Sequence, residues 1–401
     1  MVSTIAMGLL AALAGAPTAR ACTSAADCSL GGECVAGVCH CYATWKGQNC
    51  SELNLLPATA TVGKYPAAWA RPGVQSSWGG RPLFDNDTGT WHLYAADMTG
   101  GCGLKSWRSN SAIAHAVASN PAGPYQYVDQ TLTPWAHNPA AHRAPDGASL
   151  IYHIGDGASH PGFPLYTNCS NGTHGPTRRG TDASDDGGPR TQPAATPPPP
   201  PAQVGDLIMP TMLLGSGPAG PWEKFVPSRG DHPPPVVEHS CTNPGVFFFP
   251  NGTTLLVCKD LSVAVADSWK GPYYLRSVTP MVGEDGVIWR AVEDGSFHML
   301  YHTTDYPARH RGIGTTAWSA DGLRWTSAFP TTPNTTVGQT YPSFPKGFQM
   351  VGGTVWTADR RERHQLAFDA AGRPAYLFNG VQVGGTMEDF TFTSVQPIAT
   401  S

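Results

Sequence analysis

The chain has 401 residues, of which 10 are Cys, 46 are Gly and 38 are Pro. Only 13% of the residues are charged, 40% are hydrophobic, and the formal net charge is -4. The length allows a sizeable core in about two or three domains. The high Gly and Pro content disfavours a helical bundle or coiled coil and favours short strands joined by turns. The near-neutral charge gives no electrostatic basis for binding nucleic acid.

The first 21 residues are typical of a cleaved secretory signal peptide. Small and apolar residues run from Ile5 to Ala16, and Ala19-Arg20-Ala21 places small residues where a signal peptidase reads them. The run is too short to span a bilayer, and no later stretch is long and apolar enough, so we expect no membrane span. The alternative is a buried N-terminal helix. The leader predicts a secreted, extracellular protein.

Asn-x-Ser/Thr sequons are spread along the chain. They lie at Asn49, Asn86, Asn168, Asn171, Asn251 and Asn334. In a secreted eukaryotic protein such sequons indicate glycosylation, for which Asn86, Asn251 and Asn334 are the candidates.

Residues 22–50 form a dense cysteine module. Its cysteines are Cys22, Cys28, Cys34, Cys39, Cys41 and Cys50, and it ends in an aromatic-x-Gly-x-x-Cys sequence from Trp45 to Cys50. A segment this short needs cross-links to stay folded, and spacing alone leaves the connectivity open. The alternative of a zinc site is disfavoured by the secretory leader and by the lack of a suitable ligand set.

The cysteine spacing resembles an EGF-like domain. That resemblance implies the pairs Cys22–Cys34, Cys28–Cys39 and Cys41–Cys50. Calcium-binding members carry acidic ligands just before the first cysteine, and here signal peptide occupies that position, so we expect no calcium site of that type. The module is expected to act as a spacer or adhesion unit, through which an extracellular protein partner could bind.

One pattern recurs from Trp78 onward: a short polar motif, a strand, a turn with Gly, a second strand, and often a Gly-Pro-aromatic end. The five openings are Trp78-Gly79-Gly80, His137-Asn138-Pro139, Thr242-Asn243-Pro244, Glu284-Asp285-Gly286 and Arg363-His364. Repeats of this kind are typical of propeller blades. We therefore predict an all-β fold, a five-bladed β-propeller over residues 65–395, preceded by the small disulfide-rich EGF-like module.

The second repeat is much longer than the others because of residues 156–206. This segment is polar and contains consecutive prolines from Pro197 to Pro201. It lacks the apolar residues needed to form a core, so we predict an exposed, largely disordered insertion that interrupts a blade.

The repeats resemble the five-bladed propeller of glycoside hydrolase family 43, and more closely a family-43-like group often fused to EGF modules. The similarity rests on the Gly-Pro-aromatic blade ends, the openings, Ile288-Trp289, Arg361-Glu362-Arg363 and Phe378-Asn379-Gly380. It implies an axial pocket with three carboxylates: an Asp general base on blade one, an Asp on blade two that tunes the acid, and a Glu general acid on a later blade. Inverting chemistry needs a protonated acid and an ionised base on opposite sides of a water.

This chain departs from that pattern. Gly79 stands at the expected base, and Asn138 and Asn243 stand at the second and third openings. Only the fourth opening keeps acids, so Glu284, as general acid, and Asp285 are the catalytic candidates. The base is unassigned.

Three other aspartates could replace the missing base. They are Asp85, Asp87 and Asp97. Asp85 and Asp87 lie near a turn and are expected at the surface.

Further residues at the openings are candidates for binding substrate. They are Trp78, His137, Asn138, Asn243, Arg360, Arg361 and Glu362. Each has a structural alternative: the aromatic and the histidine can pack at a blade edge or hub, the asparagines can form turns before proline, and the arginines can be a solvated charge run.

Four cysteines lie outside the N-terminal module. Cys241 and Cys258 flank a hairpin and are expected to pair, which leaves Cys102 and Cys169. The sequence shows no motif for a metal or cofactor, and none is expected.

The function predicted from the sequence is that of a secreted carbohydrate-active protein whose propeller acts on or binds a glycan or polysaccharide in an axial pocket. The enzymatic form is a glycosidase with Glu284 as general acid. The alternative is a non-catalytic glycan-binding or adhesion protein that has lost the catalytic aspartates. A hydrolase needs at least two suitably placed carboxylates, so the carboxylates at the axis should discriminate between the two.

Overall fold

The structure is a computed structural model. It describes residues 21–59, 68–70, 76–167, 169, 202–230, 237–304, 314–328, 343–382 and 390–401. The predicted signal peptide, apart from residue 21, lies outside these residues. So do the sequons at Asn168, Asn171 and Asn334 and most of the Pro-rich segment. Within the described residues, no helix has the length and hydropathy needed to cross a membrane.

Five antiparallel blades follow one another along the chain. Blade one contains β5 (Trp69–Ala70), β6 (Ser77–Asp85), β7 (Thr90–Met98), β8 (Ser111–Ala118) and β9 (Tyr125–Leu132). Blade two contains β10 (Ala136–Arg143), β11 (Ser149–Gly155), β12 (Leu207–Gly215) and β13 (Trp222–Phe225), with β14 (Glu238–Cys241) beside β12. Blade three contains β15 (Gly245–Phe248), β16 (Thr254–Val257), β17 (Val263–Ala266) and β18 (Tyr273–Ser277).

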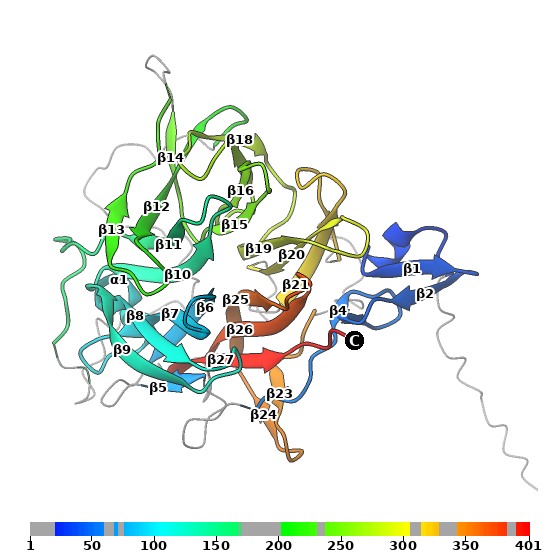
Figure 1. Cartoon of the computed structure of the whole chain (residues 1–401), viewed down its shortest axis with the longest axis horizontal. Coiled ribbons are helices and arrows are strands. Elements are labelled where there is room, and N and C mark those ends of the chain that lie inside the picture. The colour runs from blue at the N-terminus through cyan, green and yellow to red at the C-terminus, as the bar shows by residue number, and fades with distance from the viewer. Residues whose placement is uncertain are drawn as a thin grey trace, which may run out of the picture.

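The last two blades complete the circle. Blade four contains β19 (Glu284–Arg290), β20 (Phe297–His302), β21 (Gly314–Ser319) and β22 (Thr326–Ser327). Blade five contains β25 (Arg360–Phe368), β26 (Pro374–Gln382) and β27 (Thr391–Pro397), and the hairpin β23 (Gly347–Gln349) and β24 (Val355–Thr357) precedes it. Figure 1 shows β6, β10, β15, β19 and β25 gathered around the middle of the molecule, with the outer strands radiating from them. The predicted all-β, five-bladed propeller is confirmed.

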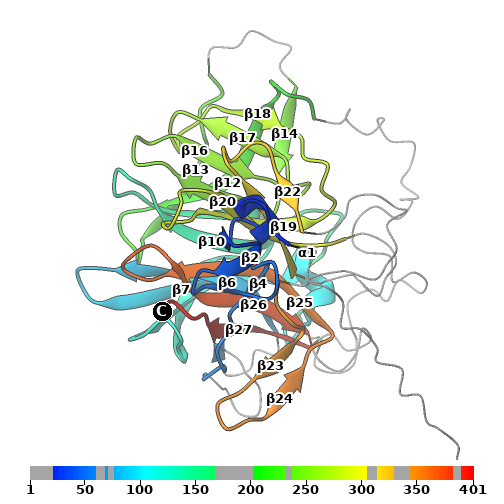
Figure 2. The same cartoon turned by 90° about the vertical axis from the view of Figure 1, so that its right-hand side faces the viewer.

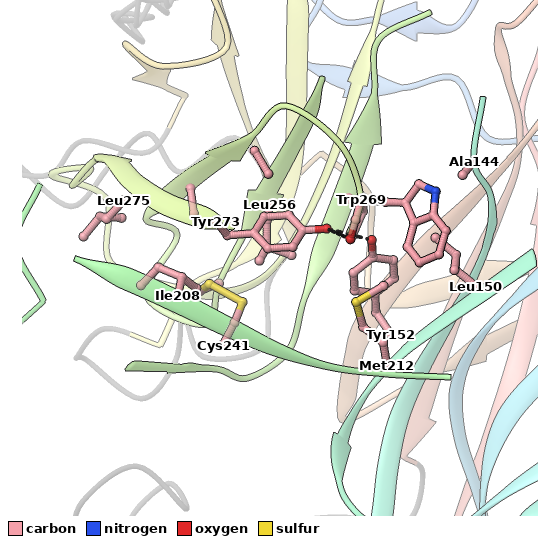
Figure 3. Packing of buried hydrophobic residues seen from close by; sticks show 14 residues of the cluster. Ala144, Leu150, Tyr152, Ile208, Met212, Cys241, Leu256, Trp269, Tyr273 and Leu275 are labelled. Carbon is pink, nitrogen blue, oxygen red and sulfur yellow. Dashed lines mark hydrogen bonds between the residues drawn. A yellow bond between two sulfur atoms is a disulfide. The ribbon is translucent and has the colours of Figure 1, made fainter. Parts of the chain in front are cut away.

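Apolar side chains between neighbouring blades hold the propeller together. Blades two and three share one cluster, in which the hydroxyl groups of Tyr152 and Tyr273 lie 3.2 Å apart and Tyr273 donates to the Trp269 carbonyl at 2.7 Å (Figure 3). The disulfide Cys241–Cys258 joins β14 to the end of the β16 segment beside this cluster. The expected pairing of these two cysteines is therefore present in the core.

The innermost strands share one irregularity at their beginnings. Pairing with the next strand breaks after Trp78, His137, Glu284 and Glu362, and each break skips two residues. The first skipped residue has a left-handed backbone, as does Asn243 just before β15; these five residues are Gly79, Asn138, Asn243, Asp285 and Arg363. Bulges of this kind re-aim side chains. The predicted openings thus coincide with the left-handed residues, four of which lie at bulges, and the fifth opening is Glu362-Arg363-His364.

The segment in which we expected the insertion lies between β11 and β12, two paired strands of blade two. Its described parts are residues 156–167, residue 169 and residues 202–206. Cys169 forms a disulfide with Cys102 of blade one, so the start of the insertion is tied to the propeller.

The N-terminal module has the disulfides that the EGF resemblance implies. They are Cys22–Cys34, Cys28–Cys39 and Cys41–Cys50. The module contains the 3-10 helix η1 (Ala25–Cys28) and the strands β1 (Gly32–Val35), β2 (Val38–Cys41), β3 (Trp45–Lys46) and β4 (Glu52–Leu53).

The module packs directly on the propeller, beside blade four (Figures 1 and 2). Trp45 is 5% exposed and stacks on Trp289 with ring centroids 6.1 Å apart, and its ring lies 5.2 Å from that of His298. The same cluster includes Leu366 of blade five. Such burial differs from what is expected of a free spacer, because the two parts share one apolar core.

We expect Trp45→Ala to lower the free energy of unfolding by about 3 kcal/mol, because it removes a buried indole between module and blade. Chemical denaturation measures this change. The adjacent, exposed Lys46→Ala is the control and should stay within about 0.5 kcal/mol of the wild type. Equal stability of Trp45→Ala and the wild type would mean that the module contributes nothing to the propeller.

Candidate functional site

Polar side chains from the blade openings meet at the axis of the propeller. Those from blades two to five are Asn138, Asn243, Glu284, Asp285, Glu362 and Arg363, joined by His302 from the end of β20. We call this group the axial cluster. Most of its members are buried, so their charges must be balanced within the cluster.

The strongest contact in the axial cluster joins blades four and five. Arg363 donates from Nη1 to Asp285 Oδ1 at 2.5 Å, and its backbone N–H donates to Asp285 Oδ2 at 3.1 Å. Both side chains are buried. Burial alone would raise the pKa of Asp285, but the charges of Arg363 and His302 outweigh it and hold that pKa well below its usual range. Asp285 is therefore ionised at neutral pH.

His302 bridges two neighbouring carboxylates. Its Nδ1 lies 3.0 Å from Asp285 Oδ2, and its Nε2 lies 3.1 Å from Glu284 Oε1. Burial alone would lower the pKa of His302, but the carboxylates of Glu362 and Asp285 and the hydrogen bonds raise it well above 6.5. The imidazole is therefore charged and belongs to the same ionic network.

Amide side chains carry the network through blades two and three. Asn138 donates from Nδ2 to Asn243 Oδ1 at 3.0 Å, and Asn243 donates from Nδ2 to Glu284 Oε2 at 3.2 Å. Arg363 donates from Nη2 to the Asn138 carbonyl at 3.1 Å. With the contacts of His302, these bonds form a closed ring through four blades.

Blade one contributes a glycine where the family resemblance implies the general base. A Cβ at Gly79 would lie 3.0 Å from the Cβ of Arg363, which is tighter than an ordinary contact. Arg363 thus lies against the position where a side chain of residue 79 would begin. Residue 79 therefore has little room for a side chain such as that of an aspartate.

Glu362 is paired with Arg360 at the opening of blade five. Arg360 donates from Nε to Oε1 at 2.8 Å and from Nη2 to Oε2 at 2.5 Å. Burial alone would raise the pKa of Glu362, but Arg360 and His302 lower it. Glu362 is therefore ionised as well.

Trp78 is 3% exposed and lies beneath Arg360, whose guanidinium carbon is 5.8 Å from the indole centroid. A Cβ at Gly380 would come within 2.4 Å of the Trp78 ring, so the indole packs on the backbone of β26. The structure places Trp78 in the packing between blades.

Arg361 is separate from the axial cluster. It donates from Nε to Asn379 Oδ1 at 2.9 Å and from Nη2 to Gln396 Oε1 at 2.9 Å, and its guanidinium lies 4.0 Å from the Phe348 centroid. Burial lowers its pKa to about 9. The arginines of this segment are thus mostly buried, unlike a solvated charge run.

The ionisation of the axial carboxylates limits their chemistry. A general acid needs a raised pKa, and both Asp285 and Glu362 have lowered ones. Glu284 has 16% of its side chain exposed and also lies 3.4 Å from Lys259 Nζ. Asp85, which we expected at the surface, is only 8% exposed, because it accepts bonds from Asp87 N and Thr88 Oγ1 in the β6–β7 turn; Asp87 is exposed as expected.

An open pocket adjoins the axial cluster between blades one and two. It has a volume of about 200 Å³ and is lined by Trp107, Arg108, Trp135, His137, Ile154, Gly155, His160 and Phe163. We call it the aromatic pocket. Phe163 is 41% exposed, and Trp107 and Trp135 are half-buried, so aromatic rings border solvent here.

His137 connects the pocket to the axis, because it immediately precedes Asn138. Its Nδ1 lies 2.7 Å from Ser111 Oγ, and its ring stacks on Trp107 at 5.0 Å between centroids. Burial, with a contribution from the charge of Arg363, lowers the pKa of His137 to about 3. The imidazole is therefore a neutral polar group at the wall of the pocket.

Two loops contribute to the pocket wall, beside Trp135 and residues of β10 and β11. One carries the 3-10 helix η2 (Leu104–Ser106) and the short helix α1 (Trp107–Asn110), and the other follows β11. The disulfide Cys102–Cys169 joins them, and Asn110 donates from Nδ2 to the Tyr166 carbonyl at 2.7 Å while accepting from Tyr166 N at 3.1 Å. The rings are thus held in place before any ligand binds.

Among the described residues, the one grouping with ligand atoms close enough for a metal is Cys22, Cys28 and Cys39. All three are in disulfides, so they lack the thiolates that a metal needs.

Sequence reasoning missed His302 and the aromatic residues of the pocket. His302 ends a strand instead of opening a repeat, and its role depends on the register that pairs it with Glu284. Trp107, Trp135 and Phe163 lie outside the repeated motif. The disulfide between Cys102 and Cys169 was the available signal that their two loops meet.

Neither a protein-family model nor a curated protein matches the sequence. The structure is similar to a family 117 glycoside hydrolase of the marine bacterium Zobellia galactanivorans, with a TM-score of 0.48, 9% identity, and coverage of 88% of this chain and 91% of that chain. It is also similar to an endo-arabinase of Bacteroides thetaiotaomicron, with a TM-score of 0.43, 12% identity, and coverage of 81% of this chain and 94% of that chain. A third similar structure is an α-L-arabinofuranosidase of Lactobacillus brevis, with a TM-score of 0.43, 11% identity, and coverage of 82% of this chain and 92% of that chain. At these low identities, the fold assignment rests on the sheets and bulges of the chain itself.

The charge of His302 predicts a pH dependence of stability. Its pKa is raised in the folded state, so its contribution is complete below about pH 6.5 and is lost as the pH rises toward the folded pKa, by up to about 1.4 kcal/mol per pH unit. His137 and His364, whose pKa values are lowered to about 3, act oppositely and destabilise below about pH 6.5. Denaturation midpoints between about pH 6.5 and pH 9 measure the decline.

His302→Gln should be less stable and should lack this alkaline decline, whereas His40→Gln at an exposed position should retain it. A wild-type stability that is constant across the same interval would mean that His302 is neutral in the folded protein.

Proposed function

We propose that this protein is a secreted glycan-binding propeller whose ligand site is the aromatic pocket. The observation that carries the proposal is the set of three aromatic side chains, Trp107, Trp135 and Phe163, around an open cavity next to the axis. Binding pockets of this kind combine apolar walls with a few fixed polar groups. Here His137 and Arg108 supply such groups.

The chemistry of a sugar ring suits this wall. One face of a pyranose carries C–H bonds that are apolar and weakly positive, and the π face of an indole or phenyl ring is apolar and weakly negative. The hydroxyl edge of the sugar needs polar partners, which His137 can supply because its imidazole stays neutral. The propeller motifs, which resemble those of family 43, support the same ligand class.

Binding is favoured over hydrolysis by the charges at the axis. Asp285 and Glu362 are ionised and paired with arginines, and Gly79 replaces the expected base. The roles that we assign to Asn138, Asn243 and these carboxylates are therefore in holding the hub. A glycosidase with Glu284 as general acid is the second candidate, since Glu284 is the axial carboxylate with some exposure.

The extracellular location is part of the proposal. All ten cysteines are paired in disulfides, which suits an oxidising compartment. Asn86 and Asn251 are exposed in hairpin turns, where an attached N-glycan would face solvent. A protein partner at the N-terminal module remains a prediction, as does glycosylation at Asn334.

We expect Phe163→Ala and Trp135→Ala to weaken sugar binding at least about tenfold, because each removes a stacking surface. A glycan array identifies the ligand, and calorimetry measures its affinity. Phe84→Ala is the matched control, since Phe84 is similarly exposed at 37% but lies in the β6–β7 hairpin. No bound glycan on the array, or unchanged affinity of both pocket variants, would refute the proposal.

Hydrolysis is tested separately with aryl glycosides and plant or algal polysaccharides. We expect no released sugar from the wild type, and Glu284→Gln should keep wild-type glycan affinity. Sugar release by the wild type that is lost in Glu284→Gln would instead establish the glycosidase.

A further inference from the structure

The imidazole of His137 has one nitrogen engaged inside the protein and lies at the wall of the aromatic pocket. Nδ1 lies 2.7 Å from Ser111 Oγ, and the ring stacks on Trp107 with 5.0 Å between centroids. These two contacts fix the plane of the ring. Among the described residues none forms a hydrogen bond with Nε2, and His137 lines the pocket. Nε2 is therefore the ring nitrogen that a ligand can reach.

Two other N–H groups of the wall already have acceptors. Trp135 donates from Nε1 to the Phe163 carbonyl at 2.8 Å, which leaves the faces of its ring for contact with a sugar. His160 Nε2 lies 3.1 Å from Asp156 Oδ1 at the exposed rim. The position of the proton on His137 therefore decides whether the inner part of the wall offers a ligand a hydrogen-bond donor or an acceptor.

Ser111 determines where that proton lies. It begins β8, is 0% exposed, and has His137 as the hydrogen-bond partner of its hydroxyl group in the described part of the chain. If Nδ1 carried the ring proton, the imidazole would donate to Oγ, and the buried hydroxyl proton would have no acceptor there. A buried donor without a partner costs more than a typical hydrogen bond contributes. The hydroxyl group therefore donates to Nδ1, which places the ring proton on Nε2.

The surroundings of His137 keep the ring neutral, so the two tautomers are the states that compete at neutral pH. Burial, with a contribution from the charge of Arg363, lowers the pKa of His137 to about 3. In a neutral imidazole one nitrogen is a donor and the other an acceptor. The bond from Ser111 thus selects between two chemically different pocket walls.

We propose that Ser111 is a positioning residue for sugar recognition: its hydroxyl group holds the proton of His137 on Nε2, so that the pocket presents a fixed N–H donor to an acceptor oxygen of a sugar stacked on the aromatic wall. This inference rests on the proposed glycan-binding function and specifies how the ligand is read. The acceptor is a hydroxyl or ether oxygen of the sugar, since both accept hydrogen bonds.

The tautomer is measured without a ligand by nitrogen NMR of the histidine rings, recorded on the full secreted protein with isotope-labelled histidine. His137→Phe identifies the signals of His137. We expect a single tautomer with the proton on Nε2 at neutral pH. In Ser111→Ala the two nitrogen signals should move toward each other, because the tautomers then interchange. Ser149→Ala is the matched control, since Ser149 is also buried, at 1%, but lies at the other end of the β10–β11 pair.

Calorimetry with methyl galactoside measures the consequence for binding. Loss of the fixed donor should weaken binding about three- to tenfold in Ser111→Ala, whereas Ser149→Ala should keep the wild-type affinity. His137→Phe keeps a ring against Trp107 but removes both nitrogens, so it should lose at least as much. Because Ser111 acts through His137, the variant that carries both substitutions should bind as His137→Phe does, and no more weakly.

The two measurements separate this inference from the proposed function. A wild-type ring with its proton on Nδ1, or an unchanged tautomer in Ser111→Ala, overturns the role of Ser111 whatever the sugar affinity. Losses of affinity that add in the double variant would show that Ser111 only supports the local fold and would likewise overturn it. If methyl galactoside does not bind, the donor has no sugar acceptor and the inference fails, while the glycan array still decides whether the protein binds glycans at all.

Discussion

The buried ion pair between Arg363 and Asp285 organises the hub of this propeller. Removing one member of such a pair leaves a buried charge uncompensated, at a cost of about 3–5 kcal/mol. Here the cost would extend further, because Arg363 also donates to the Asn138 carbonyl and Asp285 also contacts His302. The closed ring of bonds therefore links blades two to five at the point where their strands begin. Blade one makes contact with this ring at Gly79, where the absence of a side chain leaves room for Arg363.

The family of bulges could be predicted from the sequence because each repeat marks it in the same way. A left-handed residue followed by Pro, Gly or His lies near the start of each innermost strand, and Asn138 and Asn243 are residue types that adopt this backbone readily. The disulfides of the N-terminal module were predictable because its cysteine spacing resembles that of EGF-like domains, and that resemblance implies the pairing. Both predictions depend on local sequence.

The remaining features depend on contacts that no local pattern records. In the sequence, Arg363 belongs to a run of charged residues. Only the fold shows that its side chain turns inward toward Asp285. The aromatic pocket is lined by loops and strand residues of blades one and two, so its composition follows from the register and from the Cys102–Cys169 disulfide. The docking of Trp45 on Trp289 likewise joins segments far apart in the chain. The sequence therefore predicted which residues lie near the axis better than it predicted which side chains those residues contact.

The close fit of Gly79 against Arg363 couples these two positions. An aspartate introduced at residue 79 would start with its Cβ crowded against Arg363, in a backbone conformation that disfavours side chains. Shortening Arg363 alone would leave Asp285 buried without its cation. Either substitution alone therefore destabilises the hub, so a side chain at residue 79 requires a compensating change elsewhere that keeps Asp285 paired.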